Sequence, residues 1–225
     1  ADGERLAWLT GFTGSAGFCV VTGDRAVLFF AGRYTPQAKT QTDPAVFTIE
    51  SLIDNPPARW LEANASPGMK VGYDPWLVTI EQEKRFARAL DKAGGALVAT
   101  ENLVDRIWTN RPDRPLGRVE MHPLEFAGRS AADKLAELAR VIADADADYC
   151  VMSDPASVAW TFNIRGADIA HIPVALSFAL LGAERRPLLF IDQRKLDPDT
   201  DAALSAIADL DGPDELTTAI AQLGR

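Results

Sequence analysis

Few residues in this sequence have the types and spacing that catalysis or metal binding requires. Its two histidines, His122 and His171, lie in loop-like segments beside Pro123 and Pro173. The chain has no HExxH, CxxC, EF-hand or Walker A motif. A metal site built on either histidine would need carboxylate ligands drawn from scattered positions. We therefore predict ordinary loop histidines, no metal ligands and no cofactor in this chain.

The candidate nucleophiles and acid/base groups also favour structural roles. Ser15 lies in TGSAG (Thr13–Gly17), which resembles the GxSxG nucleophile elbow, but a threonine replaces the first glycine. The predicted strand also follows this serine instead of preceding it. Asp144, Asp146 and Asp148 are spaced by two at a predicted helix end, so their side chains point in different directions. We predict a tight turn at Ser15, a solvated helix end at the aspartates and no catalytic residue.

Two arginines stand beside glycines at the ends of apolar segments, in GRY at 32–34 and NIRG at 163–166. Such an arginine can bind a carboxylate through two parallel hydrogen bonds. It can equally clamp a domain interface, and we favour this structural role. Substrate gating or interface contacts are therefore assigned to Arg33, Tyr34, Asn163 and Arg165.

The first half of the chain alternates between predicted strands and helices. Residues 17–22 and 26–30 predict a β-hairpin around Gly23-Asp24. A helix over 79–93 is predicted from its apolar stripe and from the capping-box pair Thr79 and Gln82. A further helix is expected over 56–65, with strands over 69–73 and 96–99.

The second half follows the segment 111–122, which together with Pro123 has three prolines and predicts an interdomain linker. Ser130 is the expected N-cap of a helix over 131–143, and Asp154 opens a short helix that ends at Phe162. Strands are predicted over 149–152, 174–181 and 188–191, and a last helix over 213–223.

An internal repeat links the two halves. AWLTGFTG at 7–14 aligns with AWTFNIRG at 159–166, and VLFFAGR at 27–33 aligns with LLFIDQR at 188–194. The first pair of segments is offset by 152 residues and the second by 161, and a nine-residue insertion near 168–173 accounts for the difference. The repeat predicts two similar α/β domains in tandem. Because a helix and a strand precede only the second copy, we expect an equivalent pair to be missing before Ala1, leaving an unpaired sheet edge.

The composition excludes several classes of function. The 225 residues are 47% hydrophobic with a formal net charge of −9, which argues against nucleic acid and anionic membrane surfaces as partners. No apolar run approaches the ~18 residues of a membrane span. Cys19 and Cys150 lie in apolar runs and are predicted to be buried free thiols, and Trp8 and Trp160 to be core or interface aromatics.

Several motifs, taken in order, resemble one family. They are RLAWLTGFTGSAG at 5–17, FFAGRY at 29–34, VGYDP at 71–75, NLVDRIWTNRP at 102–112, FAGRSAADKLAELA at 126–139, SVAWTFNIRGADIAHIPVALSFALL at 157–181 and LLFID at 188–192. Together they resemble the N-terminal part of the long, three-domain Xaa-Pro aminopeptidases. One departure is Ala31, where the family usually has aspartate before GRY.

The resemblance implies a fold and a division of labour. We expect two tandem creatinase N-terminal-like α/β domains, each a mixed β-sheet flanked by helices, over 1–115 (with a truncated start) and 116–225. A catalytic pita-bread domain, absent here, would hold two divalent metal ions, usually manganese, and remove the N-terminal residue that precedes proline. This chain would be inactive alone and would support oligomerisation and active-site access. The implied partners are that catalytic domain, a second copy in a homodimer and proline-containing peptides, in the cytoplasm.

Two alternatives remain open at this point. The chain resembles other pita-bread hydrolases, prolidase and creatinase, mainly in one N-terminal domain, whereas the tandem repeat favours the longer type. A free-standing interaction module without a catalytic partner is the other alternative.

Overall fold

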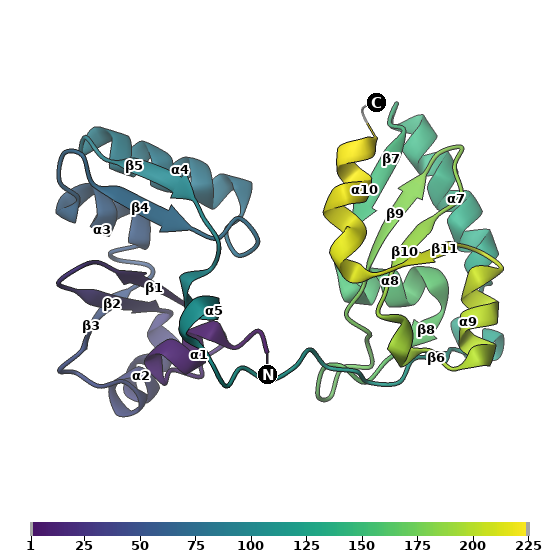
Figure 1. Cartoon of the computed structure of the whole chain (residues 1–225), viewed down its shortest axis with the longest axis horizontal. Helices are drawn as coiled ribbons and strands as arrows, with labels where there is room; N and C mark the ends of the chain where they lie inside the picture. Colours follow the sequence, from purple (N-terminus) through teal and green to yellow (C-terminus); the bar gives the residue numbers. More distant parts are fainter. Residues whose placement is uncertain (1, 224–225) are drawn as a thin grey trace. The chain divides into compact units, whose positions relative to one another are not determined.

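The computed structural model describes residues 2–223 of the chain. They form two compact units, and the chain divides into them between Arg114 and Pro115 (Figure 1). Each unit combines a mixed β-sheet with helices on both faces. The expected class of two tandem α/β domains is confirmed.

The first unit is built around a three-stranded sheet in the order β1-β2-β3. Strands β1 and β2 form the predicted antiparallel hairpin, and β3 lies parallel to β2. A separate parallel pair consists of β4 and β5. The elements of this unit are α1 (Arg5–Thr10), β1 (Gly17–Val21), β2 (Ala26–Phe30), the 3-10 turn η1 (Gly32–Tyr34), α2 (Thr35–Gln41), β3 (Phe47–Ser51), α3 (Pro57–Asn64), β4 (Lys70–Tyr73), α4 (Ile80–Lys92), β5 (Ala96–Ala99) and α5 (Leu103–Ile107).

Alternate residues of β2 supply two cores, as the two-residue period of a strand requires. Val27 and Phe29 pack on α3 and α4, where Leu61 and Leu90 are buried. Leu28 and Phe30 face the other side and pack with Phe12 and with residues of α1 and α2. Helix α4 begins at the predicted capping box, in which Thr79 and Gln82 exchange hydrogen bonds of 2.9 and 3.2 Å.

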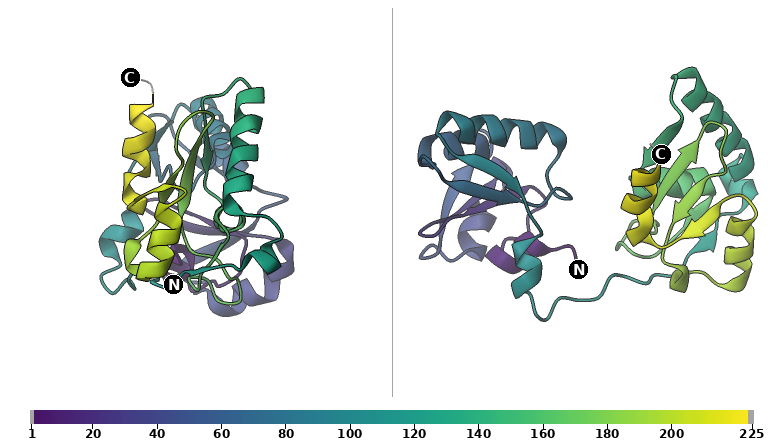
Figure 2. Two further views of the ribbon diagram at one scale, coloured as in Figure 1. Left: turned by 90° about the vertical axis from the view of Figure 1, so that its right-hand side faces the viewer. Right: turned by 45° about the horizontal axis from the view of Figure 1, so that its top comes forward.

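The second unit contains a four-stranded sheet in the order β11-β10-β9-β7. Its elements are β6 (Glu120–Met121), α6 (Leu124–Ala127), α7 (Ala131–Asp144), β7 (Tyr149–Met152), α8 (Pro155–Phe162), β8 (Ile164–Arg165), β9 (Phe178–Gly182), β10 (Leu188–Phe190), the 3-10 turn η2 (Gln193–Lys195), α9 (Pro198–Ser205), β11 (Asp209–Asp211), the 3-10 turn η3 (Pro213–Glu215) and α10 (Leu216–Gln222). Figures 1 and 2 show this sheet between α10 on one side and α7 on the other.

Alternation along β10 again separates two cores. Leu189 packs with α7, α8 and α9, in the larger core that contains Val158 and Phe162. Phe190 packs with Leu216 of α10 on the opposite face. Ser130 and Asp154 cap α7 and α8 as expected.

The predicted repeat is visible in the structure. In both units a helix (α1 or α8) precedes an antiparallel hairpin, a 3-10 turn follows it, and a parallel third strand lies beside the second. Val27 pairs with Val20 as Leu188 pairs with Leu180, and the second hairpin turn is one residue longer. The insertion is therefore divided between that turn and the segment before β9.

Several sequence-based expectations need correction. Strand β9 begins at Phe178 and not near residue 174, and the final helical segment is a 3-10 turn followed by α10. The short elements α2, β3, α9 and β11 were not predicted. Cys150 is exposed on β7, whose outer edge has no partner strand among the described residues. Cys19 is partly buried, and burial raises the pKa of its thiol to about 11. Both thiols are free, as predicted.

Strand β1 pairs only with β2 among the strands of residues 2–223, so its other edge is unpaired in this structure. In the second unit the corresponding edge, on β9, is filled by antiparallel β7. Val21 is 59% exposed on β1, whereas Leu181 at the equivalent position is only 3% exposed. An exposed apolar edge is a template for strand pairing between chains.

Val21→Lys will therefore reduce self-association of this chain at high concentration, because a charge on an edge strand blocks edge-to-edge pairing. Light scattering across a concentration series measures the effect. Val141→Lys is the matched control, because Val141 is 56% exposed on helix α7 and not on a strand edge. Each variant should change the free energy of unfolding by no more than about 0.5 kcal/mol. Equal scattering from both variants would show that the β1 edge does not drive association.

No helix within residues 2–223 is long and apolar enough to span a bilayer.

Candidate functional site

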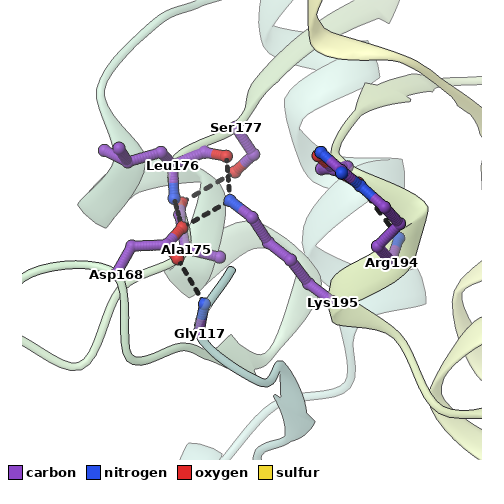
Figure 3. Close-up of polar contacts among 8 residues, drawn as sticks. Gly117, Asp168, Ala175, Leu176, Ser177, Arg194 and Lys195 are labelled. Atoms are coloured by element: carbon purple, nitrogen blue, oxygen red, sulfur yellow. Dashed lines mark hydrogen bonds and ion pairs between the residues drawn. The ribbon is translucent and has the colours of Figure 1, made fainter. Parts of the chain in front are cut away.

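The second unit contains a buried ion pair between Asp168 and Lys195 (Figure 3). Lys195 Nζ lies 2.5 Å from Asp168 Oδ2, and the two side chains are 4% and 0% exposed. Asp168 also accepts hydrogen bonds from the backbone amides of Gly117 (2.9 Å) and Leu176 (2.6 Å). One carboxylate thus fastens three segments: the stretch before β6, the loop before β9 and the turn η2.

Gly117 is required where it approaches this loop. A Cβ atom at residue 117 would lie 2.5 Å from the carbonyl carbon of Ala167, a backbone atom that cannot swing aside. The close approach allows the residue 117 amide to reach Asp168. The network therefore depends on chain geometry as well as on charge.

A second polar cluster surrounds Asn163 at the end of α8. Asn163 takes the left-handed conformation (φ 51°, ψ 50°), where the first repeat has Gly11 (φ 76°) at the end of α1. Asparagine tolerates this conformation better than most residues, and it adds a side chain that glycine lacks. Its Oδ1 accepts a 2.6 Å hydrogen bond from Lys134, and its Nδ2 donates to the carbonyl of Arg129 (2.8 Å).

Lys134 is a buried cation without a carboxylate partner among the described residues. It is 2% exposed, donates to the carbonyl of Trp160 (2.6 Å) and lies 4.4 Å from the centre of the Trp160 ring. Burial lowers the pKa of Lys134, and the neighbouring charges of Arg129 and Arg165 lower it further. The lysine is thus held by neutral oxygens and an aromatic face.

The predicted candidates of the first unit lie together in the structure. The Ser15 hydroxyl is 2.6 Å from the Tyr34 hydroxyl, and Arg33 donates to Ser15 Oγ at 3.4 Å. The guanidinium of Arg33 also stacks 4.7 Å from the centre of the Tyr34 ring. Hydrogen bonds from Ser15 and then from Arg33 lower the pKa of the Tyr34 phenol. We call Ser15, Arg33 and Tyr34 the arginine–tyrosine cluster.

The predicted candidates of the second unit do not form a comparable cluster. Asn163 is largely buried and the side-chain hydrogen bonds described above for it are internal, whereas the Arg165 side chain at the end of β8 donates to the adjacent carbonyl of Ile164 (2.8 Å). Trp8 and Trp160 are 37% and 50% exposed, so neither is a fully buried core residue. His122 and His171 lie in loops, as predicted.

Sequence reasoning missed Asp168, Lys195 and Lys134. Lys134 had a detectable signal, because it is spaced four and eight residues from Leu138 and Ile142 on the apolar stripe of α7. Asp168 and Lys195 are 27 residues apart and carried no local pattern. These polar groups hold loops in place, and within residues 2–223 no three His, Cys, Asp or Glu side chains are arranged to hold a metal ion.

Asp192 supplies a further contact at the start of η2. Its carboxylate accepts hydrogen bonds from Arg194 Nε (2.9 Å), from Arg194 Nη2 (2.6 Å) and from the Arg194 backbone amide (3.1 Å). These hydrogen bonds lower the pKa of Asp192 from 3.8 to about 2. The carboxylate is stabilised in the folded state relative to the unfolded chain.

Asp192→Ala will lower the free energy of unfolding by about 1–2 kcal/mol at pH 7, because it removes a cap and an ion pair. A lowered folded-state pKa means that this stabilisation is complete above about pH 4 and is lost as the pH falls toward about 2. Urea unfolding of both proteins at pH 7, 4 and 3 should therefore show a difference that narrows with acidity. A constant difference would assign the effect to packing and not to the carboxylate.

Comparison with known proteins assigns the chain to a family. A model of the creatinase/prolidase N-terminal domain matches residues 110–225, and a second model of the same description matches residues 1–107. The chain belongs to the creatinase/prolidase N-terminal domain family.

Relatives of this creatinase/prolidase N-terminal chain are longer proteins. Aminopeptidase P1 of Lotus japonicus is 35% identical over 197 residues, which cover 87% of this chain and 30% of that protein. A protein of Ajellomyces capsulatus named "Probable Xaa-Pro aminopeptidase P" is 37% identical over 199 residues, with coverage of 87% and 32%. This chain therefore spans about a third of the length of these relatives.

A solved structure shows the same fold. The crystal structure of X-prolyl aminopeptidase from Caenorhabditis elegans, described as a cytosolic enzyme with a di-nuclear active site, matches with a TM-score of 0.90. The two sequences are 30% identical, and the match covers 97% of this chain and 36% of the worm enzyme. The expected resemblance to the N-terminal part of Xaa-Pro aminopeptidases is confirmed.

Proposed function

We propose that this chain is the non-catalytic N-terminal region of an Xaa-Pro aminopeptidase, a hydrolase that removes the N-terminal residue preceding proline. The observation that carries the proposal is the match of nearly the whole chain to one third of the worm X-prolyl aminopeptidase. The polar groups described above also support it, because the buried ones fasten loops and turns to one another and none forms a nucleophile–base pair.

The chemistry would reside in a catalytic domain outside residues 1–225. The residues described here offer no cluster that fits a metal ion, so no catalytic step is assigned to them. By analogy with the di-nuclear worm enzyme, the parent would bind two divalent ions, for which we propose manganese, and would act in the cytosol on proline-containing peptides.

The proposed role of this chain is to support homodimer formation and to restrict access to the active site. Arg33, Tyr34 and Arg165 are the candidate contacts, because their side chains form no ion pair within residues 2–223. Asn163 would act indirectly, since its contacts position the end of α8. No residue of this chain is proposed to touch the scissile bond.

The 225-residue chain should therefore release no amino acid from a peptide such as Ala-Pro-Ala above the buffer rate, with or without Mn²⁺. The full-length product of the same gene, assayed in parallel, should cleave the peptide before proline and lose that activity on chelation. Cleavage by the short chain would overturn the non-catalytic assignment. An inactive full-length protein of proven metal content would overturn the aminopeptidase assignment.

A further inference from the structure

At one aligned position the second repeat has an acidic residue and the first has none, which changes the partner available to a nearby arginine. The aligned motifs VLFFAGR and LLFIDQR place Ala31 opposite Asp192 and Arg33 opposite Arg194. The strand registers support this alignment, because Val27 pairs with Val20 as Leu188 pairs with Leu180. The backbones also agree: residue 31 has φ −71° and ψ 140°, and residue 192 has φ −70° and ψ 110°, each just before a 3-10 turn.

In the second unit the arginine is satisfied internally. Asp192 lies beside Arg194 and accepts two hydrogen bonds from its guanidinium, at 2.9 and 2.6 Å. In the first unit the methyl group of Ala31 can accept nothing, and η1 has no side-chain cap. Among residues 2–223, no carboxylate lies within ion-pairing distance of Arg33.

Arg33 is nevertheless held in position. Its guanidinium stacks on the Tyr34 ring and donates to Ser15 Oγ, and the Ser15 hydroxyl is hydrogen-bonded to the Tyr34 hydroxyl. Stacking leaves the edge of a planar guanidinium available for a fork of parallel N–H donors. Two hydroxyl groups adjoin that fork; their mutual hydrogen bond uses one of their two protons, and the other proton can be donated to an anion.

We propose that the arginine–tyrosine cluster of Ser15, Arg33 and Tyr34 binds a carboxylate supplied from outside the first unit. The expected ligand is the carboxylate of an acidic side chain or of a small organic acid. It would occupy the position relative to Arg33 that the Asp192 carboxylate occupies relative to Arg194. A carboxylate suits a single guanidinium because two parallel N–H···O bonds match its two oxygens. The inference does not depend on the proposed peptidase function.

Titration with sodium acetate, followed by NMR of the arginine Nε–H groups, tests the site in the 225-residue protein. The ionic strength is kept constant with NaCl, and the Arg33 signal is identified by its loss in Arg33→Lys. Binding should produce a saturating shift at Arg33 and raise the pKa of Tyr34, measured by ultraviolet absorbance, because carboxylate charge offsets the guanidinium that lowers it.

Ala31→Asp supplies the carboxylate internally and should abolish the acetate shift. Ala45→Asp adds the same charge at an exposed turn and should leave the shift intact. A peptide carrying glutamate side chains separates the two sources: affinity at least about tenfold above that of acetate assigns the site to a polypeptide ligand, and equal affinity assigns it to small organic acids.

Three results would each overturn the proposal. They are a shift that grows linearly without saturation, a shift of equal size at all exposed arginines, and unchanged acetate binding in folded Ala31→Asp. Nitrogen-15 backbone spectra of each variant establish that it is folded, so that a lost signal is assigned to the site.

Discussion

Replacing Asp168 with alanine will lower the free energy of unfolding of the second unit by about 3–5 kcal/mol. Within residues 2–223, the substitution leaves the Lys195 ammonium, whose side chain is 4% exposed, with the carbonyl of Leu176 at 3.3 Å as its remaining partner. It also leaves the amides of Gly117 and Leu176 without their acceptor. A buried charge without a partner costs much more than the lost attraction itself, and the two amides lose an acceptor as well.

Hydrogen exchange measured by mass spectrometry reports this loss separately for each unit. Peptides covering 115–120 and 172–178 should exchange faster in Asp168→Ala, whereas peptides of β1 and β2 should be unchanged. Glu81→Ala is the matched control, since it removes a carboxylate from the exposed pair with Arg85 and should cost no more than about 1 kcal/mol. Similar losses of unfolding free energy from both substitutions would show that burial does not determine how much the Asp168–Lys195 pair stabilises the unit.

The double variant Asp168→Leu with Lys195→Met separates the cost of the unpaired Lys195 cation from the cost of the backbone amides that lose their acceptor. If the main cost of Asp168→Ala is an orphaned buried cation, removing both charges should destabilise the unit less than removing one. A double variant as unstable as Asp168→Ala would instead assign the cost to the amides of Gly117 and Leu176.

The sequence predicted the parts of the fold that local chemistry determines. Thr79, Ser130 and Asp154 were recognised as helix caps because a cap and its amide partner lie within three residues. The hairpin of β1 and β2 was recognised from its alternation and turn. Strands β3 and β11 were missed, and the three residues of β11 are too few to show the alternation of a strand.

In the polar clusters too, contacts between sequence neighbours could be predicted and contacts between distant residues could not. Arg33 and Tyr34 are adjacent in sequence, and their contact in the structure follows from the turn that carries them. The approach of Ser15 to Tyr34 joins residues 19 apart and depends on the packing of the loop before β1. The Asp168–Lys195 pair depends on the placement of the loop before β9 and could not be read from either residue alone.

Asn163 has two structural roles, one for its backbone conformation and one for its side-chain hydrogen bonds. Its backbone needs a left-handed conformation, which costs an ordinary L-residue about 1–2 kcal/mol. Its side chain supplies one of the two oxygens that bind the buried Lys134 ammonium, and it donates to the carbonyl of Arg129. The first repeat meets only the backbone requirement, with Gly11.

Asn163→Ala should therefore lower the free energy of unfolding of the second unit by about 3–5 kcal/mol, as the sum of lost hydrogen bonds to a charge and backbone strain. Asn163→Gly loses the same hydrogen bonds without the strain and should be about 0.5–1 kcal/mol less damaging, because glycine's greater freedom in the unfolded chain offsets part of the gain. Urea unfolding followed by hydrogen exchange of the segment 124–134 measures both. Equal losses would mean that the backbone at residue 163 relaxes, and negligible losses would mean that Lys134 finds another oxygen.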